Sequence, residues 1–231
     1  MEGDYFIKDE EFLTKPKSIS LKSIKIILNI METQICKIKY DNDRYGTGFF
    51  CNIPYDDNKF KVLITNSHVL NKDDISINKI IRFSLDDERI QYEILMDESR
   101  KKFINEKYAI TIIEIKENDK LNNIKYFDID NRLFKENSKE IFTNESIILL
   151  HYPRGENMEH SMGMIQSINE DNYTFQHLCN SNKGSSGAPL INLNNYQVIG
   201  VHNEVNTENV YNLGIFLKEP IEKFIEEIKN N

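Results

Sequence analysis

Short β-favouring runs, separated by turns rich in Asp, Asn, Gly and Lys, recur along most of this 231-residue chain and constrain its fold more than any other feature. They form two series, separated by a polar connector at 116–123. The first series comprises 35–40, 47–53, 59–65, 80–85, 90–96 and 109–115, and the second comprises 124–129, 146–151, 162–168, 174–179, 189–192, 197–202 and 211–217. Two series of about six strands predict a mostly β chain that folds as two packed six-stranded antiparallel β-barrels.

Both ends of the chain show helical periodicity. From Ser18 to Gln34, apolar residues recur at three- and four-residue spacing, after serines that can cap a helix. This stripe consists of Leu21, Ile24, Leu28, Met31 and Ile35. A second stripe, over 219–229, consists of Ile221, Phe224, Ile225 and Ile228. We therefore expect an N-terminal and a C-terminal α-helix that flank the two barrels.

One domain accounts for the whole chain, 1–231. Hydrophobic residues make up 39% and charged residues 29% of it, an ordinary globular profile. β-Barrel proteins of this length often form a single domain. We expect an N-terminal extension and helix over about 1–34, a first barrel over about 35–120, a second barrel over about 121–217 and a C-terminal helix over about 219–230.

Charge and hydropathy exclude several classes of partner. The formal net charge of −8 argues against nucleic-acid binding, which needs a basic face. No apolar run is long enough to span a membrane. The start, MEGDYFIKDEEF, lacks the basic and apolar regions of a secretory signal. These patterns predict a cytoplasmic protein.

Cysteine and histidine usage predicts neither a disulfide framework nor a metal site. Cys36, Cys51 and Cys179 are an odd set without a CxxC pair, so we expect buried free thiols in a reducing compartment. The histidines His151, His160 and His177 lack metal-ligand spacing, and we interpret them as structural or surface residues. We expect no zinc and no other cofactor.

A glycine-serine turn at 184–190, GSSGAPL, lies between two β runs and carries the most specific chemical signal. A tight glycine turn can expose the hydroxyl of Ser186. The backbone N–H groups of Gly184 and Ser186 can then converge on one point, as in an oxyanion hole for acyl transfer. Taken alone, such a turn is more often only a hairpin loop.

A second motif, TNSHVL at 65–70, follows the apolar strand KVLI and the glycine-containing strand GTGFF at 46–50. A lone histidine is usually structural, but GTGFF, LITNSHV and GSSGAPL in this order resemble the chymotrypsin-like (trypsin-like) serine protease family. The resemblance spans roughly 35–217, with motifs closest to glutamyl-endopeptidase-like and HtrA-like single-domain members.

The resemblance implies a serine endopeptidase that acts on polypeptides. His68 would be the general base and Ser186 the nucleophile, held within hydrogen-bond reach across the interface between the barrels. Ser185 stands where digestive enzymes carry an aspartate that pairs with a newly cut N-terminus. Activation by that ion pair is therefore not expected.

The acid of the implied catalytic triad is missing. In the family it opens a strand written D-I-T-L-L-K-L, and this chain reads AITIIEI from Ala109 to Ile115, so that Ala109 occupies the aspartate position. An alanine can neither orient His68 nor stabilise its imidazolium. Replacing the acid by an amide in a related triad lowers turnover about 10⁴-fold, so we expect an inactive or strongly impaired enzyme.

Three explanations for Ala109 stay open: a substitution made to silence the enzyme, a natural pseudoprotease, or another carboxylate, such as Asp97 or Glu106, that reaches His68. We favour the first, because decay would have no reason to spare His68, Ser186 and the oxyanion glycine. A carboxylate arriving from a loop would have to replace the whole geometry.

A substrate pocket is implied by GVHN at 200–203, which resembles the strand of glutamyl endopeptidases and viral chymotrypsin-like cysteine proteases. There the histidine lines the primary specificity pocket. His202, with Ser181 and Asn180, would form a hydrogen-bonding pocket without negative charge, so we predict Glu, Gln or Asp before the scissile bond. The alternative is that His202 is an ordinary core histidine.

Two function classes follow. The first is a serine endopeptidase that performs limited proteolysis of an intracellular protein, in an impaired form. The second is a pseudoprotease that uses the cleft between the barrels to bind a peptide or protein segment. Oligomeric state and natural substrate are not encoded in any motif.

Overall fold

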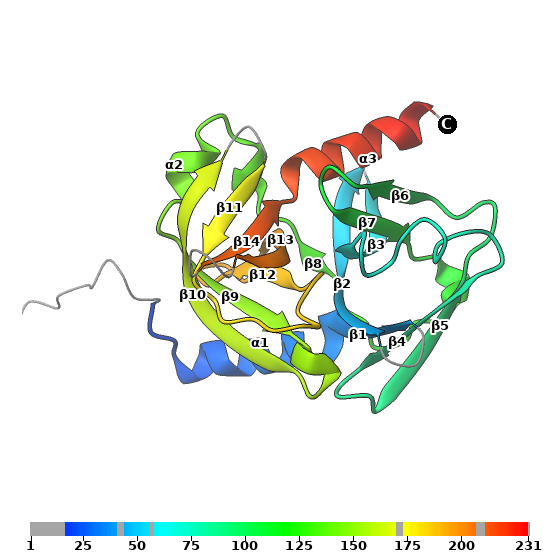
Figure 1. Cartoon of the computed structure of the whole chain (residues 1–231), viewed down its shortest axis with the longest axis horizontal. Coiled ribbons are helices and arrows are strands. Elements are labelled where there is room, and N and C mark those ends of the chain that lie inside the picture. Colours follow the sequence, from blue (N-terminus) through cyan, green and yellow to red (C-terminus); the bar gives the residue numbers. More distant parts are fainter. Residues whose placement is uncertain (1–16, 41–43, 56–57, 170–172, 207–210, 231) are drawn as a thin grey trace, which may run out of the picture.

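The computed structural model describes residues 17–40, 44–55, 58–169, 173–206 and 211–230. The N-terminal extension expected before the first helix therefore falls mostly outside the described residues. Two β-sheets lie side by side, with the N-terminal helix along one side and the C-terminal helix across the top in Figure 1.

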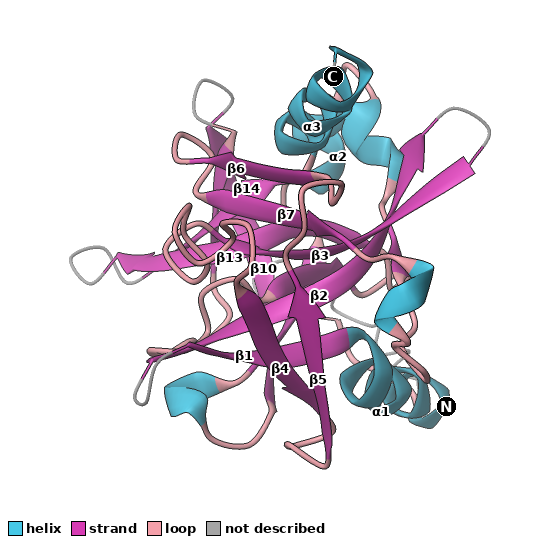
Figure 2. Ribbon diagram, turned by 90° about the vertical axis from the view of Figure 1, so that its right-hand side faces the viewer, coloured by secondary structure: helices cyan, strands magenta, loops and turns pink. Residues whose placement is uncertain are grey.

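The first sheet is open and strongly curled, with strand order β5-β4-β1-β2-β3-β7-β6, and β8 pairs in parallel with β2. Figure 2 shows its strands crossing at steep angles. Its members are β1 (Ile35–Tyr40), β2 (Arg44–Tyr55), β3 (Asn58–Asn66), β4 (Ile80–Leu85), β5 (Ile90–Leu95), β6 (Lys102–Asn105), β7 (Ile110–Glu114) and β8 (Phe127–Asp128).

The second sheet is a closed barrel with the order β10-β11-β14-β13-β12-β9. All of its neighbouring pairs are antiparallel. Its members are β9 (Ser146–His151), β10 (Glu159–Asn169), β11 (Thr174–His177), β12 (Pro189–Asn192), β13 (Val198–Asn206) and β14 (Tyr211–Phe216). This mostly β, two-barrel architecture of chymotrypsin type confirms the predicted fold class, with the first barrel as a curled half-barrel.

Three parts of the sequence-based assignment differ from the structure. The run at 124–129 was expected to open the second barrel, yet β8 pairs with Cys51 and Asn52 of the first sheet, and Ile129 alone bridges to Val198 of the second. The segment thus crosses between the sheets. Strand β6 is not predicted, because its two apolar residues, Phe103 and Ile104, are flanked by polar Lys102 and Asn105 and form no run. The short helices were also missed: α2 (Ser138–Phe142) and the 3-10 turns η1 (Glu117–Asp119), η2 (Asn131–Phe134) and η3 (Pro153–Gly155).

The N-terminal helix α1 (Leu21–Gln34) forms where predicted, and the Ser20 hydroxyl caps it by accepting the Ser23 N–H. The apolar stripe of the sequence coincides only in part with the packed face, which includes Met31. Leu21 and Leu28 are 70% and 51% exposed, whereas Ile27 and Ile30 are buried. The helix carries apolar residues around more than half of its circumference, so periodicity alone could not select the face that packs on the sheets.

The C-terminal helix α3 (Lys218–Asn230) follows the second barrel but packs on the first. The Phe224 ring lies 5.6 Å from that of Phe60 and 6.1 Å from that of Phe103, both in edge-on geometry. One hydrophobic core runs continuously from first-sheet residues such as Ile64 to second-barrel residues such as Leu149. The helix and the shared core therefore fix the two sheets against each other.

The three cysteines are free and buried, as expected from their number and spacing. Burial raises the pKa of all three thiols, that of Cys179 to about 12. In the part of the chain that the structure describes, no helix has the length and apolar character needed to cross a membrane.

Candidate active site

His68 lies in the turn that directly follows β3, on the surface of the first sheet. The end of β3 is buried and tightly bonded. Thr65 donates its hydroxyl to the carbonyl of Thr47 at 2.7 Å, and the carbonyl of Asn66 accepts the N–H groups of Val69 and Leu70 at 3.0 and 3.1 Å. These bonds close the turn around His68 and present its side chain to solvent.

Ser186 lies in the loop between β11 and β12 of the second barrel, and this loop packs on the first sheet. The Thr47 N–H donates to the carbonyl of Ser186 at 3.0 Å. The next residue, Gly187, has φ +85°, and a Cβ there would lie 2.2 Å from the Thr65 hydroxyl and 3.1 Å from the Asn66 nitrogen. Only glycine permits this approach. The serine loop therefore contacts the end of β3 within three residues of His68.

The hydroxyl of Ser186 is half-buried and donates to the carbonyl of Asn203 at 3.3 Å. The neighbouring His202 is close enough to His68 to be affected by its charge. His68 therefore lies near β13, the strand whose Asn203 carbonyl accepts the Ser186 hydroxyl.

Two carbonyl groups of the turn at Gly184 have hydrogen-bond partners. The Lys183 carbonyl accepts the Arg154 N–H at 2.5 Å, and the Gly184 carbonyl accepts the Thr47 hydroxyl at 2.9 Å. Gly184 has φ +93°, and a Cβ there would meet the Tyr152 carbonyl at 2.6 Å. Among the hydrogen bonds of the described residues, the N–H groups of Gly184 and Ser186 are not used. Such an arrangement can accept an oxyanion.

Ala109 ends a tight turn immediately before β7. Its N–H donates to the Glu106 carbonyl at 3.1 Å, and its own carbonyl accepts the Ser67 N–H at 3.0 Å and the Asn66 side-chain amide at 2.8 Å. Position 109 is therefore bonded to the residue just before His68. The φ of Ala109 is +46°, in the left-handed region that asparagine and aspartate tolerate better than alanine.

The alternative acids are differently placed. Lys116 holds the carboxylate of Asp97 at 2.8 and 3.0 Å, and the Ser99 hydroxyl donates to it at 2.8 Å. The Lys116 hydrogen bond is the main reason that the pKa of Asp97 falls to about 2. Glu106 is exposed and contacts Ala109 through its backbone. Asp97 is therefore committed to a pair on the first sheet.

The three pocket candidates have different surroundings. His202 is 1% exposed, and its Nδ1 lies 3.2 Å from Nε2 of His177. Burial, and then the nearby rings of His177, His151 and His68, lower the pKa of His202 well below its ordinary value. Ser181 donates its hydroxyl to the Asn212 side-chain oxygen at 3.1 Å, whereas Asn180 is exposed.

The histidine pair has a defined proton arrangement. Because Nδ1 of His177 accepts the Cys179 N–H at 3.3 Å, its proton resides on Nε2 and is donated to Nδ1 of His202. His202 then keeps its own proton on Nε2. A neutral His202 can therefore still donate one hydrogen bond from this nitrogen.

Sequence reasoning missed two residues that hold the serine loop. Thr47, from the GTGFF strand, donates to the Gly184 carbonyl and accepts the Tyr152 N–H at 3.1 Å. His151, interpreted as structural or surface, is buried with its Nδ1 2.6 Å from the Ser185 hydroxyl. The threonine could have been noticed as part of a motif. The histidine pairs with a residue far along the chain, and no local pattern indicates this.

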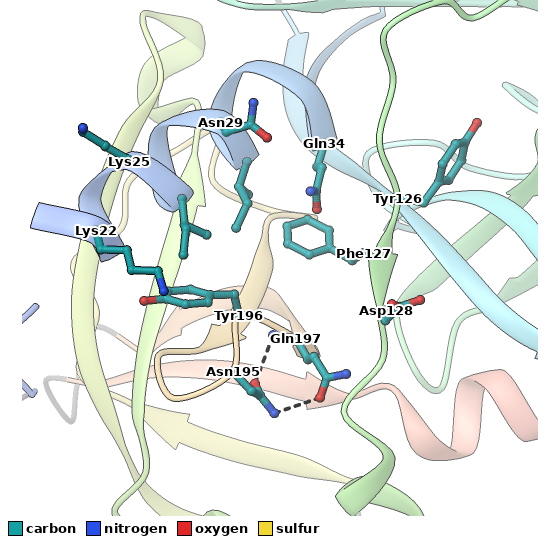
Figure 3. Close-up of a pocket in the computed structure, with 12 residues that line it drawn as sticks. Lys22, Lys25, Asn29, Gln34, Tyr126, Phe127, Asp128, Asn195, Tyr196 and Gln197 are labelled. Atoms are coloured by element: carbon teal, nitrogen blue, oxygen red, sulfur yellow. Dashed lines mark hydrogen bonds between the residues drawn. The ribbon is translucent and has the colours of Figure 1, made fainter. Parts of the chain in front are cut away.

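A cavity of about 540 Å³ lies elsewhere, between α1, the segment that contains β8 and the turn at 195–197. Figure 3 shows that the Lys22 side chain of α1 ends beside the Tyr196 ring, whereas the Lys25 side chain points away from it. None of the catalytic candidates lines it. No group of three or more His, Cys, Asp or Glu side chains within the described ranges is arranged to bind a metal ion.

Comparison with known proteins supports one family. The model of the trypsin-like peptidase domain matches residues 46–201. A search of curated proteins gave no match. Among solved structures, the serine endoprotease from Yersinia pestis superposes with a TM-score of 0.64 at 14% identity, covering 90% of this chain and 68% of that one.

The Rv3671c protease of M. tuberculosis, in an inactive form, superposes with a TM-score of 0.62 at 19% identity, covering 92% of this chain and 96% of that one. Its Ser343Ala mutant, also in an inactive form, gives 0.63 at 18% identity, covering 94% and 98%. These structures share the fold. Because the family model covers more than half of the sequence, this chain belongs to the trypsin-like peptidase domain family.

Proposed function

We propose that this chain is a serine endopeptidase in which Ser186 is the nucleophile and His68 the general base. The observation that carries the proposal is the packing of the serine loop on the end of β3, which brings the two motifs together from separate sheets. The uncommitted N–H groups of Gly184 and Ser186 support their role as oxyanion donors.

In this reaction the Ser186 oxygen attacks the peptide carbonyl carbon while His68 takes the hydroxyl proton. The negative carbonyl oxygen is stabilised by the two backbone N–H groups. The C–N bond then breaks as His68 returns the proton to the departing amine, which leaves an acyl ester on Ser186. Water, deprotonated by the same imidazole, hydrolyses that ester.

Position 109 belongs to the aspartate of this triad, and Ala109 leaves the enzyme impaired. The Ala109 carbonyl bonds to Ser67, so a carboxylate at this position would start beside the backbone that carries His68. The left-handed backbone supports the same assignment, because aspartate and asparagine adopt it more readily than alanine. The poor fit of alanine also favours a substitution that silenced an active enzyme.

The substrate is an intracellular protein cut at few sites, with Glu, Gln or Asp before the scissile bond. Neutral His202, with one N–H to donate, supports recognition of a side-chain carboxylate or amide oxygen. Ser181 donates its only hydroxyl proton to Asn212, so its oxygen can accept the amide N–H of a Gln side chain. The three free, buried thiols suit a reducing compartment such as the cytoplasm. A cleavage profile dominated by Lys or Arg would contradict this pocket.

The decisive experiment restores the acid. The Ala109→Asp variant, incubated with a fluorophosphonate probe and a peptide library, should be labelled at Ser186 and should cleave peptides up to about 10⁴-fold faster than the chain as given. Ala109→Asp combined with Ser186→Ala is the control and should do neither. An unlabelled, folded Ala109→Asp protein would refute the endopeptidase assignment.

Ala109 itself favours one other function, that of a pseudoprotease that binds a peptide or protein segment in the cleft between the barrels. This function predicts that the chain as given binds a library peptide without cutting it, and that Ala109→Asp changes neither result. Labelling of the Ala109→Asp variant separates the two functions, because it requires an activated Ser186.

A further inference from the structure

Ser185 lies between the two proposed oxyanion donors and is completely buried. Its hydroxyl oxygen accepts the Asn182 N–H at 3.0 Å and lies 2.6 Å from Nδ1 of His151. Its own N–H donates to the Asn182 carbonyl at 3.0 Å. The side chain and backbone of Ser185 therefore fix the loop on both sides of the residue that joins Gly184 to Ser186.

The proton positions in this contact follow from the partners. The Ser185 oxygen accepts a hydrogen bond from the Asn182 N–H. Its own hydroxyl proton is therefore donated to its other neighbour, Nδ1 of His151. That bond needs a neutral imidazole with its proton on Nε2. Burial lowers the pKa of His151 to about 4, which keeps the ring neutral at ordinary pH.

The charged and titratable groups around His151 come from three elements. Glu159 and His160 lie on β10, Arg154 lies in η3, and His202 lies on β13. Glu159 raises the pKa of His151, whereas Arg154 and His160 lower it. None of these effects on the pKa of His151 exceeds that of burial. The ring therefore stays neutral, and Nδ1 remains a hydrogen-bond acceptor.

His151 is itself rigidly held. It ends β9, where it pairs with Glu159 of β10, and β9 pairs on its other edge with β12, the strand that follows the serine loop. The loop has two further supports, Thr47 at the Gly184 carbonyl and Arg154 at the Lys183 carbonyl. Among these three, His151 alone reaches the residue between the two donors.

We propose that His151 is a positioning residue that holds the Gly184–Ser186 loop in its oxyanion-binding conformation through the Ser185 hydroxyl. The proposal rests on the proposed endopeptidase function. The stabilisation that this hydrogen bond gives is felt when negative charge develops on the substrate oxygen, so kcat changes and KM does not.

The kinetic test uses the Ala109→Asp background. His151→Leu removes the acceptor, and Ser185→Ala removes the donor. Each should lower kcat and the rate of fluorophosphonate labelling at least tenfold, within the 10²–10³-fold cost of losing a whole oxyanion donor, with KM nearly unchanged. The double variant should lose no more than either single one, because both remove the same bond. His151→Asn, whose side-chain oxygen can take the place of Nδ1, should recover most of the rate.

His160→Leu is the matched control, because His160 is an exposed histidine on the adjacent strand. Thermal melting of every variant separates a folding defect from a lost contact. The proposal is wrong if His151→Leu retains the kcat of His160→Leu, or if the double variant shows the product of the two single losses.

A second readout does not depend on activity. In the chain as given, ¹⁵N NMR at pH 7 should show His151 neutral with Nδ1 unprotonated, and His151→Leu should accelerate amide hydrogen exchange at 184–186 relative to His160→Leu. A protonated Nδ1 or unchanged exchange would overturn the positioning role. An unlabelled Ala109→Asp parent with the expected exchange result would instead refute the endopeptidase function alone.

Discussion

Replacing Thr47 by valine should destabilise the protein and disturb the serine loop, because its hydroxyl links three parts of the chain. It donates to the Gly184 carbonyl at 2.9 Å and accepts the Tyr152 N–H at 3.1 Å, and Thr47 is fully buried. Valine keeps the shape and the β-branching but leaves both partners unsatisfied. At about 1–3 kcal/mol for each of the two buried unpaired groups, the free energy of unfolding should fall by about 2–6 kcal/mol.

A matched control is available on the same sheet. Thr111 is also fully buried and donates its hydroxyl to the Leu70 carbonyl at 2.7 Å, without contact to the serine loop. Thr111→Val leaves one group unpaired and should lower the free energy of unfolding by about 1–3 kcal/mol. Urea denaturation followed by far-ultraviolet circular dichroism measures both losses, and the slope with urea should not change.

The comparison also separates stability from function. In the Ala109→Asp background, Thr47→Val should lower the rate of fluorophosphonate labelling at temperatures where it is folded. Thr143→Val, which removes a hydroxyl bond to the Lys139 carbonyl of α2 at 2.7 Å, should label at the parental rate. If Thr47→Val loses less stability than Thr111→Val, or labels at the parental rate, then the threonine does not hold the loop as its hydrogen bonds indicate.

Two other predictions concern the backbone and pH. Ala109→Gly should raise the free energy of unfolding by about 0.5–1 kcal/mol, because relief of a left-handed alanine exceeds the entropy cost of glycine; a lower urea midpoint would contradict this. Burial depresses the folded-state pKa of His151 to about 4 and of His177 to about 3, so the unfolded state binds more protons below pH 6.5. The free energy of unfolding should therefore have its full value above pH 6.5 and fall between pH 6.5 and 4, by about 3 kcal/mol for His151 alone. The urea midpoint measured against pH should show this fall, and His151→Asn should flatten it.

Local patterns in the sequence predicted much of the fold. Strands β1, β4, β9 and β12 begin and end at the predicted residues, because each is a short β-favouring run bounded by turn residues. The exposed stripe on α1, which includes Leu21, shows where a local pattern is insufficient: the packed face depends on the sheets beneath the helix. Likewise, β8 is set by partners on β2 that no local periodicity reveals.

The candidate site likewise contains residues that motifs indicate and residues that no local pattern indicates. His68, Ser186 and position 109 could be proposed from motifs, because tight glycine turns and strand ends restrict which residues can follow. The supports could not, since Thr47 to Gly184 and His151 to Ser185 are contacts between distant segments. Their side chains are common residue types, and only the closed barrel and the packed sheets bring the partners together.

These supports determine how such a site is assembled. In an enzyme activated by cutting its N-terminus, a new ammonium must pair with a buried carboxylate before the oxyanion loop is set. Here position 185 carries a neutral hydroxyl, and its partner His151 belongs to a strand already paired on both edges. Uncharged hydrogen bonds within a folded barrel need no new charge, so the loop can form as the barrel closes. For the proposed endopeptidase, Ala109→Asp should therefore be sufficient for activity, without cleavage of the chain.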